Sequence, residues 1–297
     1  MKAIDFSCKH DILLEDEQGL CVPMDEPYYR SREIAPATWQ ILSDGDYSYL
    51  LAGDTEAILI DSGYGAGNIR EYCEQLCGLP VPRIINTHHH FDHTANDGYF
   101  DLAYMAEESV KLATIPFPSF DGIDFPRTYN VQIVEHGDEI PLAGRDLLVL
   151  KIPDHAVGSI ALLDRKARIL FSGDELGMPF GKPINTTVAN WAALMERLVP
   201  YRGDYDAIYG GGGSVDADIV EKYLENCRAI LAGTEGVPFC MPPFNNYVKK
   251  DEQGRTIWKR RLPHPGDGPK EWHDDSEWKR KLEYAGCAVV YDNRKIR

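Results

Sequence analysis

Four histidines and one aspartate fall within six consecutive positions, in the segment Asn86-Thr87-His88-His89-His90-Phe91-Asp92-His93. Packing alone does not require so many polar rings side by side. Neutral imidazole and carboxylate are, besides thiolate, the ligands that zinc and similar divalent metals prefer. The segment is internal, so it is not an expression tag, and it predicts a metal site.

A short apolar strand is expected to position this segment. Residues 83–87 read RIINT, which is typical of a buried strand. His88 and His90 lie two residues apart on its extended continuation, so their side chains point to the same side, while His89 points away. Asp92 and His93 follow where the chain turns toward a helix. We therefore expect nitrogen and oxygen donors to converge at a strand-to-helix turn.

The pattern His88-x-His90-x-Asp92-His93 resembles the metal motif of the metallo-β-lactamase fold superfamily, and three further segments agree with it in order. Residues 57–63 (AILIDSG) are similar to a strand that ends in Asp-x-Gly. Residues 152–159 (IPDHAVGS) and 170–174 (LFSGD) resemble the later segments that carry a histidine and an aspartate. The resemblance covers about residues 37 to 232 and implies an α/β fold, a four-layer αββα sandwich.

The resemblance also implies two metal sites. The first would use His88, His90 and His155, which leave an open position of the kind that hydrolytic zinc sites have. The second would use Asp92, His93 and Asp174, but its fourth ligand is missing. Relatives commonly have Pro-Gly-His-Gly where this chain has four glycines at 210–213, so Gly212 takes the place of the histidine. We expect one tight zinc site and a second, weaker one, with iron or manganese as alternative metals.

These ligands predict a metal-dependent hydrolase. A metal-bound hydroxide would attack a small carboxylic derivative, namely a lactone, thioester, ester or amide. Asp92 is the candidate catalytic residue, because it could orient the hydroxide and pass a proton to the leaving group. The chain has no Gly-x-Ser-x-Gly motif for a covalent route.

Two other classes of function stay open. Some relatives hold one iron on two histidines and one aspartate and oxidise thiols or persulfides, and His88, His155 and Asp174 would suffice for such a mononuclear iron oxygenase. The missing fourth ligand suggests the other class, a binding protein with impaired turnover.

Composition limits the partners. The chain has 297 residues, 43% of them apolar, and a formal net charge of −16, which disfavours nucleic acid as a ligand. Its beginning has no apolar stretch that suits a signal peptide or a membrane span, and its seven scattered cysteines fit reduced thiols. We expect a cytoplasmic protein that acts on a small molecule, with no membrane partner and with a homodimer as a candidate assembly.

Three parts of the chain differ in pattern. Residues 1–36 form a polar lead-in with several prolines, expected to be irregular, and 37–236 form the main domain. Residues 237–297 carry 13 Lys+Arg and 9 Asp+Glu and are expected to be a structured extension or lid packed on the domain. The extension contains a predicted hairpin (246–250 and 256–260), a final strand (288–291), and two histidines, His264 and His273, that could replace the missing ligand. The aperiodic segment 116–130 is expected to be a loop over the site.

Overall fold

The structure is a computed structural model that describes residues 12–15, 20–24, 29–43, 46–116, 125–177, 181–240, 245–261 and 276–297. The side chains of 245–249 and 258–261 are left out of the description.

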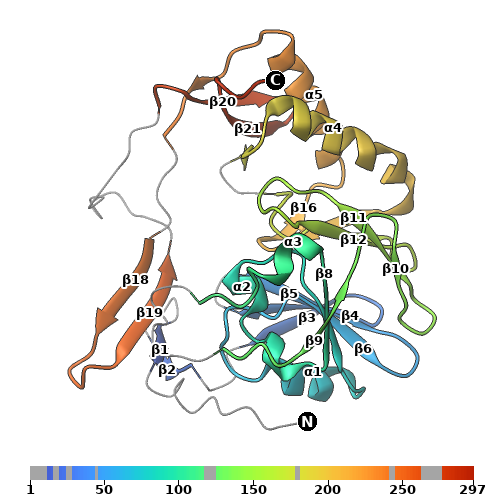
Figure 1. The fold of residues 1–297 in the computed structure, drawn as a ribbon, viewed down its shortest axis with the longest axis vertical. Helices are drawn as coiled ribbons and strands as arrows, with labels where there is room; N and C mark the ends of the chain where they lie inside the picture. Colours follow the sequence, from blue (N-terminus) through green and yellow to red (C-terminus); the bar gives the residue numbers. More distant parts are fainter. Residues whose placement is uncertain are drawn as a thin grey trace.

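A seven-stranded sheet carries the metal turn (Figure 1). Its strands stand in chain order, with antiparallel pairing from β3 to β6 and parallel pairing from β6 to β9. The bounds are β3 Arg30–Ala35, β4 Thr38–Ser43, β5 Asp46–Ala52, β6 Ala57–Ile60, β7 Arg83–Ile85, β8 Leu102–Met105 and β9 Asn130–Ile133.

A six-stranded sheet faces it. The order of its strands is β10-β11-β12-β13-β15-β16, and all neighbours are antiparallel except β13 and β15, which are parallel. The bounds are β10 Glu139–Ile140, β11 Leu147–Lys151, β12 Ile160–Asp164, β13 Ile169–Phe171, β15 Ala207–Gly210 and β16 Gly213–Val215. Strands β12 and β13 pair as an antiparallel hairpin.

Helices cover the outer faces of both sheets. Helix α1 (Ile69–Cys77) lies on the seven-stranded sheet, with α2 (Phe91–Thr94), the 3-10 turn η2 (Asp97–Tyr99) and α3 (Glu107–Val110) in the connections between its strands. Helices α4 (Val188–Leu198) and α5 (Ile219–Leu231) cover the six-stranded sheet, and the 3-10 turn η4 (Val199–Asp204) follows α4 and leads to β15. The four layers confirm the predicted αββα sandwich.

Local sequence explains the main helices. Asn68 caps α1 by accepting a hydrogen bond from the Glu71 amide, and Gly78 ends the helix in the left-handed conformation. Thr187 caps α4 in the same way. Apolar residues at helical spacing on α4 and α5 bury one face of each helix on the sheet, around the fully buried Trp191.

The prediction of irregular structure over residues 1–36 is wrong for the described part. Strands β1 (Ile12–Glu15) and β2 (Cys21–Pro23) pair with each other, and β3 is the edge strand of the seven-stranded sheet. Ile12 and Leu14 are buried in a cluster with Phe91, the first residue of α2. The described part of the lead-in packs on the metal turn through this cluster.

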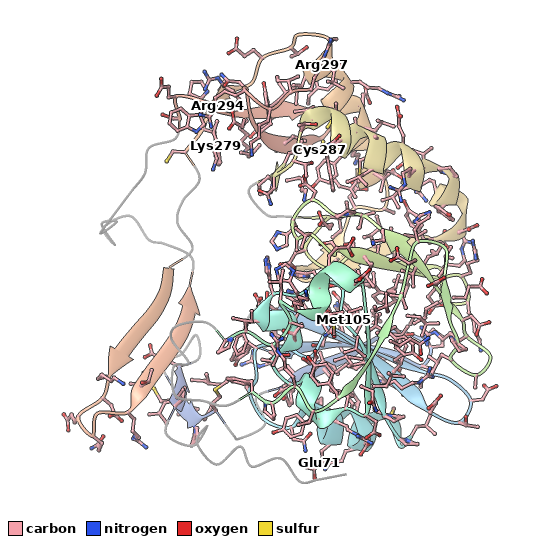
Figure 2. All side chains as sticks on the ribbon, in the orientation of Figure 1. Glu71, Met105, Lys279, Cys287, Arg294 and Arg297 are labelled. Carbon is pink, nitrogen blue, oxygen red and sulfur yellow. The ribbon has the colours of Figure 1, made fainter. Side chains whose placement is uncertain are left out.

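The C-terminal extension is divided between two small sheets. The predicted hairpin is confirmed as β18 (Asn245–Lys250) and β19 (Thr256–Arg261), and β19 pairs in parallel with β1. The predicted last strand is confirmed as β21 (Cys287–Asp292), which pairs with β20 (Lys279–Tyr284) and with β14 (Lys182–Pro183), while β17 (Val237–Pro238) pairs with β20. Arg294 and Arg297 lie at the end of the molecule opposite to Glu71 of α1 (Figure 2). The domain boundaries and the lid stay predictions.

Candidate metal centre

The first group of ligands brings together residues from two loops. His88 and His90 follow β7, and His155 lies in the loop between β11 and β12. His90 Nδ1 lies 3.1 Å from His88 Nε2 and 3.0 Å from His155 Nε2. These three nitrogens are close enough to bind one ion.

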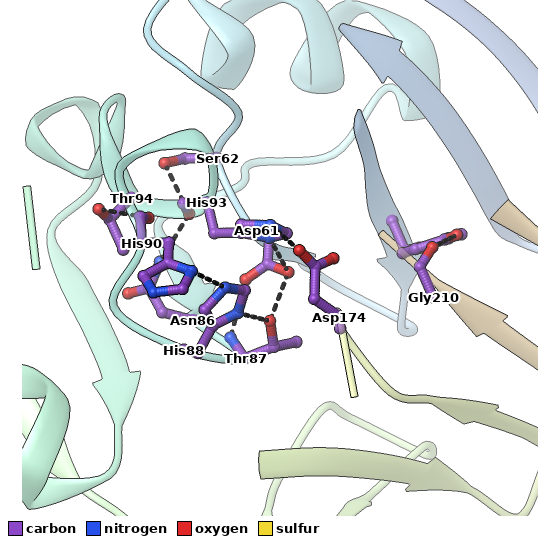
Figure 3. Close-up of polar contacts among 12 residues, drawn as sticks. Asp61, Ser62, Asn86, Thr87, His88, His90, His93, Thr94, Asp174 and Gly210 are labelled. Carbon is purple, nitrogen blue, oxygen red and sulfur yellow. Dashed lines mark hydrogen bonds and ion pairs between the residues drawn. The ribbon is translucent and has the colours of Figure 1, made fainter. Parts of the chain in front are cut away.

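The second group combines His88, His93 and Asp174, whose ligand atoms lie within 4.8 Å of one another. Asp174 follows β13 and lies beside the histidine turn (Figure 3). Its Oδ2 is 3.5 Å from His93 Nε2 and 3.7 Å from His155 Nε2. The two groups therefore have one residue, His88, in common.

Asp92 lies outside both groups. It is a buried residue of α2, and its charge raises the pKa of His90 against the larger effect of burial. Among the described residues, the two groups that could hold a metal contain five of the six predicted ligands. The role of Asp92 as ligand and proton carrier therefore stays a prediction.

A buried aspartate that received no role from the sequence orients the cluster. Asp61, directly after β6, accepts hydrogen bonds from the Thr87 amide to Oδ1 and from the Thr87 hydroxyl to Oδ2, both at 2.7 Å. The same Oδ2 lies 2.9 Å from His93 Nδ1 (Figure 3). The His93 Nδ1–H therefore donates to Asp61, so Nε2 is the nitrogen that faces the metal groups.

Thr87 links Asp61 to His88 and orients the His88 ring. The hydroxyl of Thr87 has a single hydrogen, which goes to Asp61, so its oxygen accepts from His88 Nδ1, 3.1 Å away. His88 Nε2 is then unprotonated and faces the other ligands. The Asp-x-Gly signature at 61–63 is the sequence feature that could have pointed to Asp61. It does not reveal the partners Thr87 and His93, because they lie more than 25 positions further along the chain.

Burial and charge set the protonation of the ligands. Burial lowers the pKa of His88, and it lowers the pKa of His90 to about 4, so both rings are neutral at pH 7. Burial also lowers the pKa of His93, but the carboxylates of Asp174 and Asp61 outweigh it and raise that pKa. The positive His93 in turn holds the pKa of Asp174 below its usual range, although burial opposes this.

The donor set fits a divalent metal. His93 Nε2 is buried and forms no hydrogen bond within the described chain, apart from the longer ion-pair contact with Asp174. A buried ring nitrogen without a hydrogen-bond partner is costly, and a metal ion that displaces its proton would satisfy it. Histidine binds metals as the neutral imidazole, and hydrogen bonds to Asp61 and Thr87 hold the other nitrogens of His93 and His88.

Gly211, which the sequence analysis did not single out, packs against the second group. A Cβ added at Gly211 would lie 2.0 Å from Asp174 Oδ1 and 3.2 Å from His93 Cε1, whereas one added at Gly212 would meet open space. The absence of a side chain at 211 therefore makes room for Asp174. The assignment of Gly212 to the place of the missing ligand stays a prediction.

The remaining predicted features lie outside the described residues. His264 and His273 belong to 262–275, and most of the loop predicted over the site is 117–124. Their proposed roles stay predictions.

Sequence comparison identifies the family and named relatives of the chain. The Metallo-beta-lactamase superfamily profile matches residues 44–235. The human acyl-coenzyme A thioesterase MBLAC2 is 31% identical over 59% of this chain and 70% of its own length. The chicken protein of that name is 28% identical over 42% of this chain and 56% of its own length. The hydroxyacylglutathione hydrolase of Bdellovibrio bacteriovorus is 26% identical over 52% of this chain and 59% of its own length.

Solved structures agree on the fold. A metallo-beta-lactamase from Pontibacter korlensis superposes with a TM-score of 0.54 and 16% identity, covering 67% of this chain and 99% of that protein. With the profile match over more than half of its length, the chain belongs to the metallo-β-lactamase superfamily. Together with the named relatives, this membership identifies the chain as an enzyme of the hydrolase class. Within the described ranges, none of the helices is long and apolar enough to span a membrane.

Proposed function

We propose that this protein is a metal-dependent thioester hydrolase and that zinc is its metal. The observation that carries the proposal is the convergence of His88, His90, His93, His155 and Asp174 into two groups that share His88. The relatives named for acyl-coenzyme A and hydroxyacylglutathione hydrolysis both act on thioesters, which favours this bond over the lactone, ester and amide alternatives.

Each residue has a task in this reaction. His88, His90 and His155 would hold one ion, and His93 with Asp174 would hold a second beside it. A metal bound there supplies Lewis acidity, which polarises a carbonyl and lowers the pKa of water. Asp61 and Thr87 hold the Nδ1 atoms of His93 and His88, so the Nε2 atoms face the metal groups. We assign Asp92 the transfer of a proton to the leaving thiolate.

A substrate panel tests the proposal. The purified protein would be assayed with acyl-coenzyme A and S-acylglutathione thioesters, and with lactones, esters and amides of the same acyl groups. Thioester cleavage, followed by release of free thiol, should exceed the other activities, disappear with a chelator and return with zinc. Cleavage of lactones or amides but not thioesters would contradict the substrate class.

The Asp92→Asn variant tests the proton transfer. It should lose activity while keeping its metal, whereas Asp101→Asn, on the surface between η2 and β8, should match the wild type. If Asp92→Asn were fully active, the role of Asp92 would be refuted. If the metal-bound wild-type protein cleaved none of the substrates in the panel, this result would favour a binding protein with impaired turnover.

One observation keeps a second function open. The structure groups His88 and Asp174 with His93, and not with His155 as the sequence predicted, into a two-histidine, one-carboxylate set, which is also the ligand set of non-haem iron oxygenases. Metal analysis of protein purified without added metal separates the two functions. Stoichiometric iron together with oxygen uptake on a thiol or persulfide would favour the oxygenase and refute the hydrolase.

A further inference from the structure

Three ionised side chains are buried together behind the candidate metal centre. The ammonium of Lys182 lies 2.8 Å from Glu175 Oε2 and 3.0 Å from Asp154 Oδ2, and its Nζ is 4.2 Å from the ring centre of Trp191. The three side chains are at most 1% exposed. Replacing such a buried network by apolar residues is often neutral or stabilising, so stability alone does not explain it.

The carboxylate of Glu175 holds the loop that carries His155. Its Oε1 accepts hydrogen bonds from three successive backbone amides, those of Asp154 at 3.0 Å, His155 at 2.7 Å and Ala156 at 3.4 Å. The loop therefore wraps around a single oxygen atom. Because the amide of His155 makes the shortest of these bonds, the position of Glu175 fixes the backbone of that ligand.

Asp154 fixes the same loop from its other side. Its Oδ1 accepts from the amide and the hydroxyl of Thr186, at 3.0 and 2.7 Å. Asn185 donates its side-chain amide to the carbonyl oxygen of His155 at 3.4 Å. The residues that follow β14 therefore contact the His155 loop directly.

Asp174 is tied to the network through the chain itself. It immediately precedes Glu175, so the two neighbouring carboxylates serve different partners, the metal groups and Lys182 respectively. The Glu175 amide donates to the carbonyl of Ser172 at 3.2 Å, which closes this turn. A shift of Glu175 would consequently move ligands in both loops.

The C-terminal extension holds Lys182 in place. Lys182 lies on the two-residue strand β14, which pairs in parallel with β21 through Val289 and Val290. The Ile184 amide adds a hydrogen bond to the carbonyl of Val290 at 2.8 Å. Val289 and Tyr291 of β21 are buried in the same core as α4 and α5.

We infer that Asp154, Glu175 and Lys182 form a positioning network that sets His155 and Asp174 in metal-binding geometry, and that strand β21 anchors it. The inference rests on the proposed metal centre but not on the identity of the substrate. In this inference, the end of the extension supports the site through β21 without supplying a metal ligand.

The Glu175→Gln variant is the sharpest test. A carboxylate has two accepting oxygens, whereas an amide has one, so glutamine must face either Lys182 or the three loop amides with its NH₂ group. Lys182 and Asp154 remain as a neutral pair, which favours folding. Asp164→Asn is the matched control, since Asp164 also accepts from a buried cation, Arg145, with one oxygen and from two backbone amides with the other, but contacts none of the predicted ligands.

Cobalt(II) binding, followed by its visible absorption, gives a readout that is independent of turnover. We expect Glu175→Gln to bind cobalt about 10–100-fold more weakly, with altered absorption bands, as changes of groups behind metal ligands generally do. Asp164→Asn should lower the melting temperature and leave the cobalt spectrum unchanged. Lys182→Met should reproduce the spectral change if it folds.

Two results would overturn the inference. One is a folded Glu175→Gln variant with the cobalt affinity and spectrum of the wild type, and the other is a wild-type protein that binds no cobalt. If the wild type binds cobalt and Glu175→Gln weakens that binding, but no thioester is cleaved, the network stands and the proposed hydrolase fails.

Discussion

Replacing Asp61 by asparagine should change the protonation of two candidate ligands while leaving the backbone intact. Asp61 has φ +58°, and asparagine tolerates this left-handed conformation better than other side chains except glycine. Its Oδ1 accepts from the Thr87 amide, so an asparagine would keep its oxygen there and turn its NH₂ toward the Thr87 hydroxyl and His93 Nδ1.

Two consequences follow from that orientation. His93 Nδ1 becomes an acceptor and gives up its proton, so the remaining proton of the ring lies on Nε2, the nitrogen that faces Asp174. The Thr87 hydroxyl accepts from asparagine and can donate to His88 Nδ1, which moves the His88 proton to Nε2 as well. Because each group then contains a ring whose metal-facing nitrogen carries a proton, we expect the affinity of each for zinc to fall by about 10–100-fold. This corresponds to about 1.4–2.7 kcal/mol of binding free energy per ion.

Competition with a coloured chelator would measure zinc affinity in the apoprotein, and nitrogen NMR would report the histidine tautomers. Asp164→Asn is again the control, because it removes a buried carboxylate without contacting the ligands. Unchanged zinc affinity in a folded Asp61→Asn variant, with His93 still protonated on Nδ1, would refute the reasoning.

Three further predictions use the same site. Because neighbouring carboxylates raise the pKa of His93, zinc binding at pH 7 should displace roughly one proton from this ring, which calorimetry in buffers of different ionisation enthalpy would detect; heats that do not depend on the buffer would contradict it. Burial raises the pKa of Asp97 from 3.8 to about 8, so the folded state holds its proton and stability should fall as pH rises through this window, by up to about 1.4 kcal/mol per pH unit. Asp97→Asn should flatten that slope in urea unfolding at pH 5 to 7, and an equally steep slope in the variant would exclude Asp97 as its source. Gly211→Ala should weaken zinc binding because its Cβ would collide with Asp174, whereas Gly212→Ala should not; equal affinities in the two variants would count against the packing at 211.

Local pattern in the sequence was sufficient for much of the fold and of the site. The histidine turn after β7 and the hairpin of β18 and β19 each depend on residues within about a dozen positions, where periodicity and turn residues act directly. The grouping of His155 and Asp174 with the turn came from family resemblance and not from periodicity.

Tertiary structure alone decided which strands the lead-in and the extension join and which buried charges support the ligands. Ile12 of β1 pairs with Thr256 of β19, and Lys182 of β14 with Val289 of β21, so these short strands depend on partners more than a hundred positions away. A strand of two to four residues has too little periodicity to be read from sequence, and it forms because another strand offers free amide and carbonyl groups. Glu175 belongs to no sequence motif, and the Asp-x-Gly signature of Asp61 does not show which groups it contacts. Their roles arise because folding buries them, and a buried carboxylate must accept hydrogen bonds from whatever donors the fold brings close.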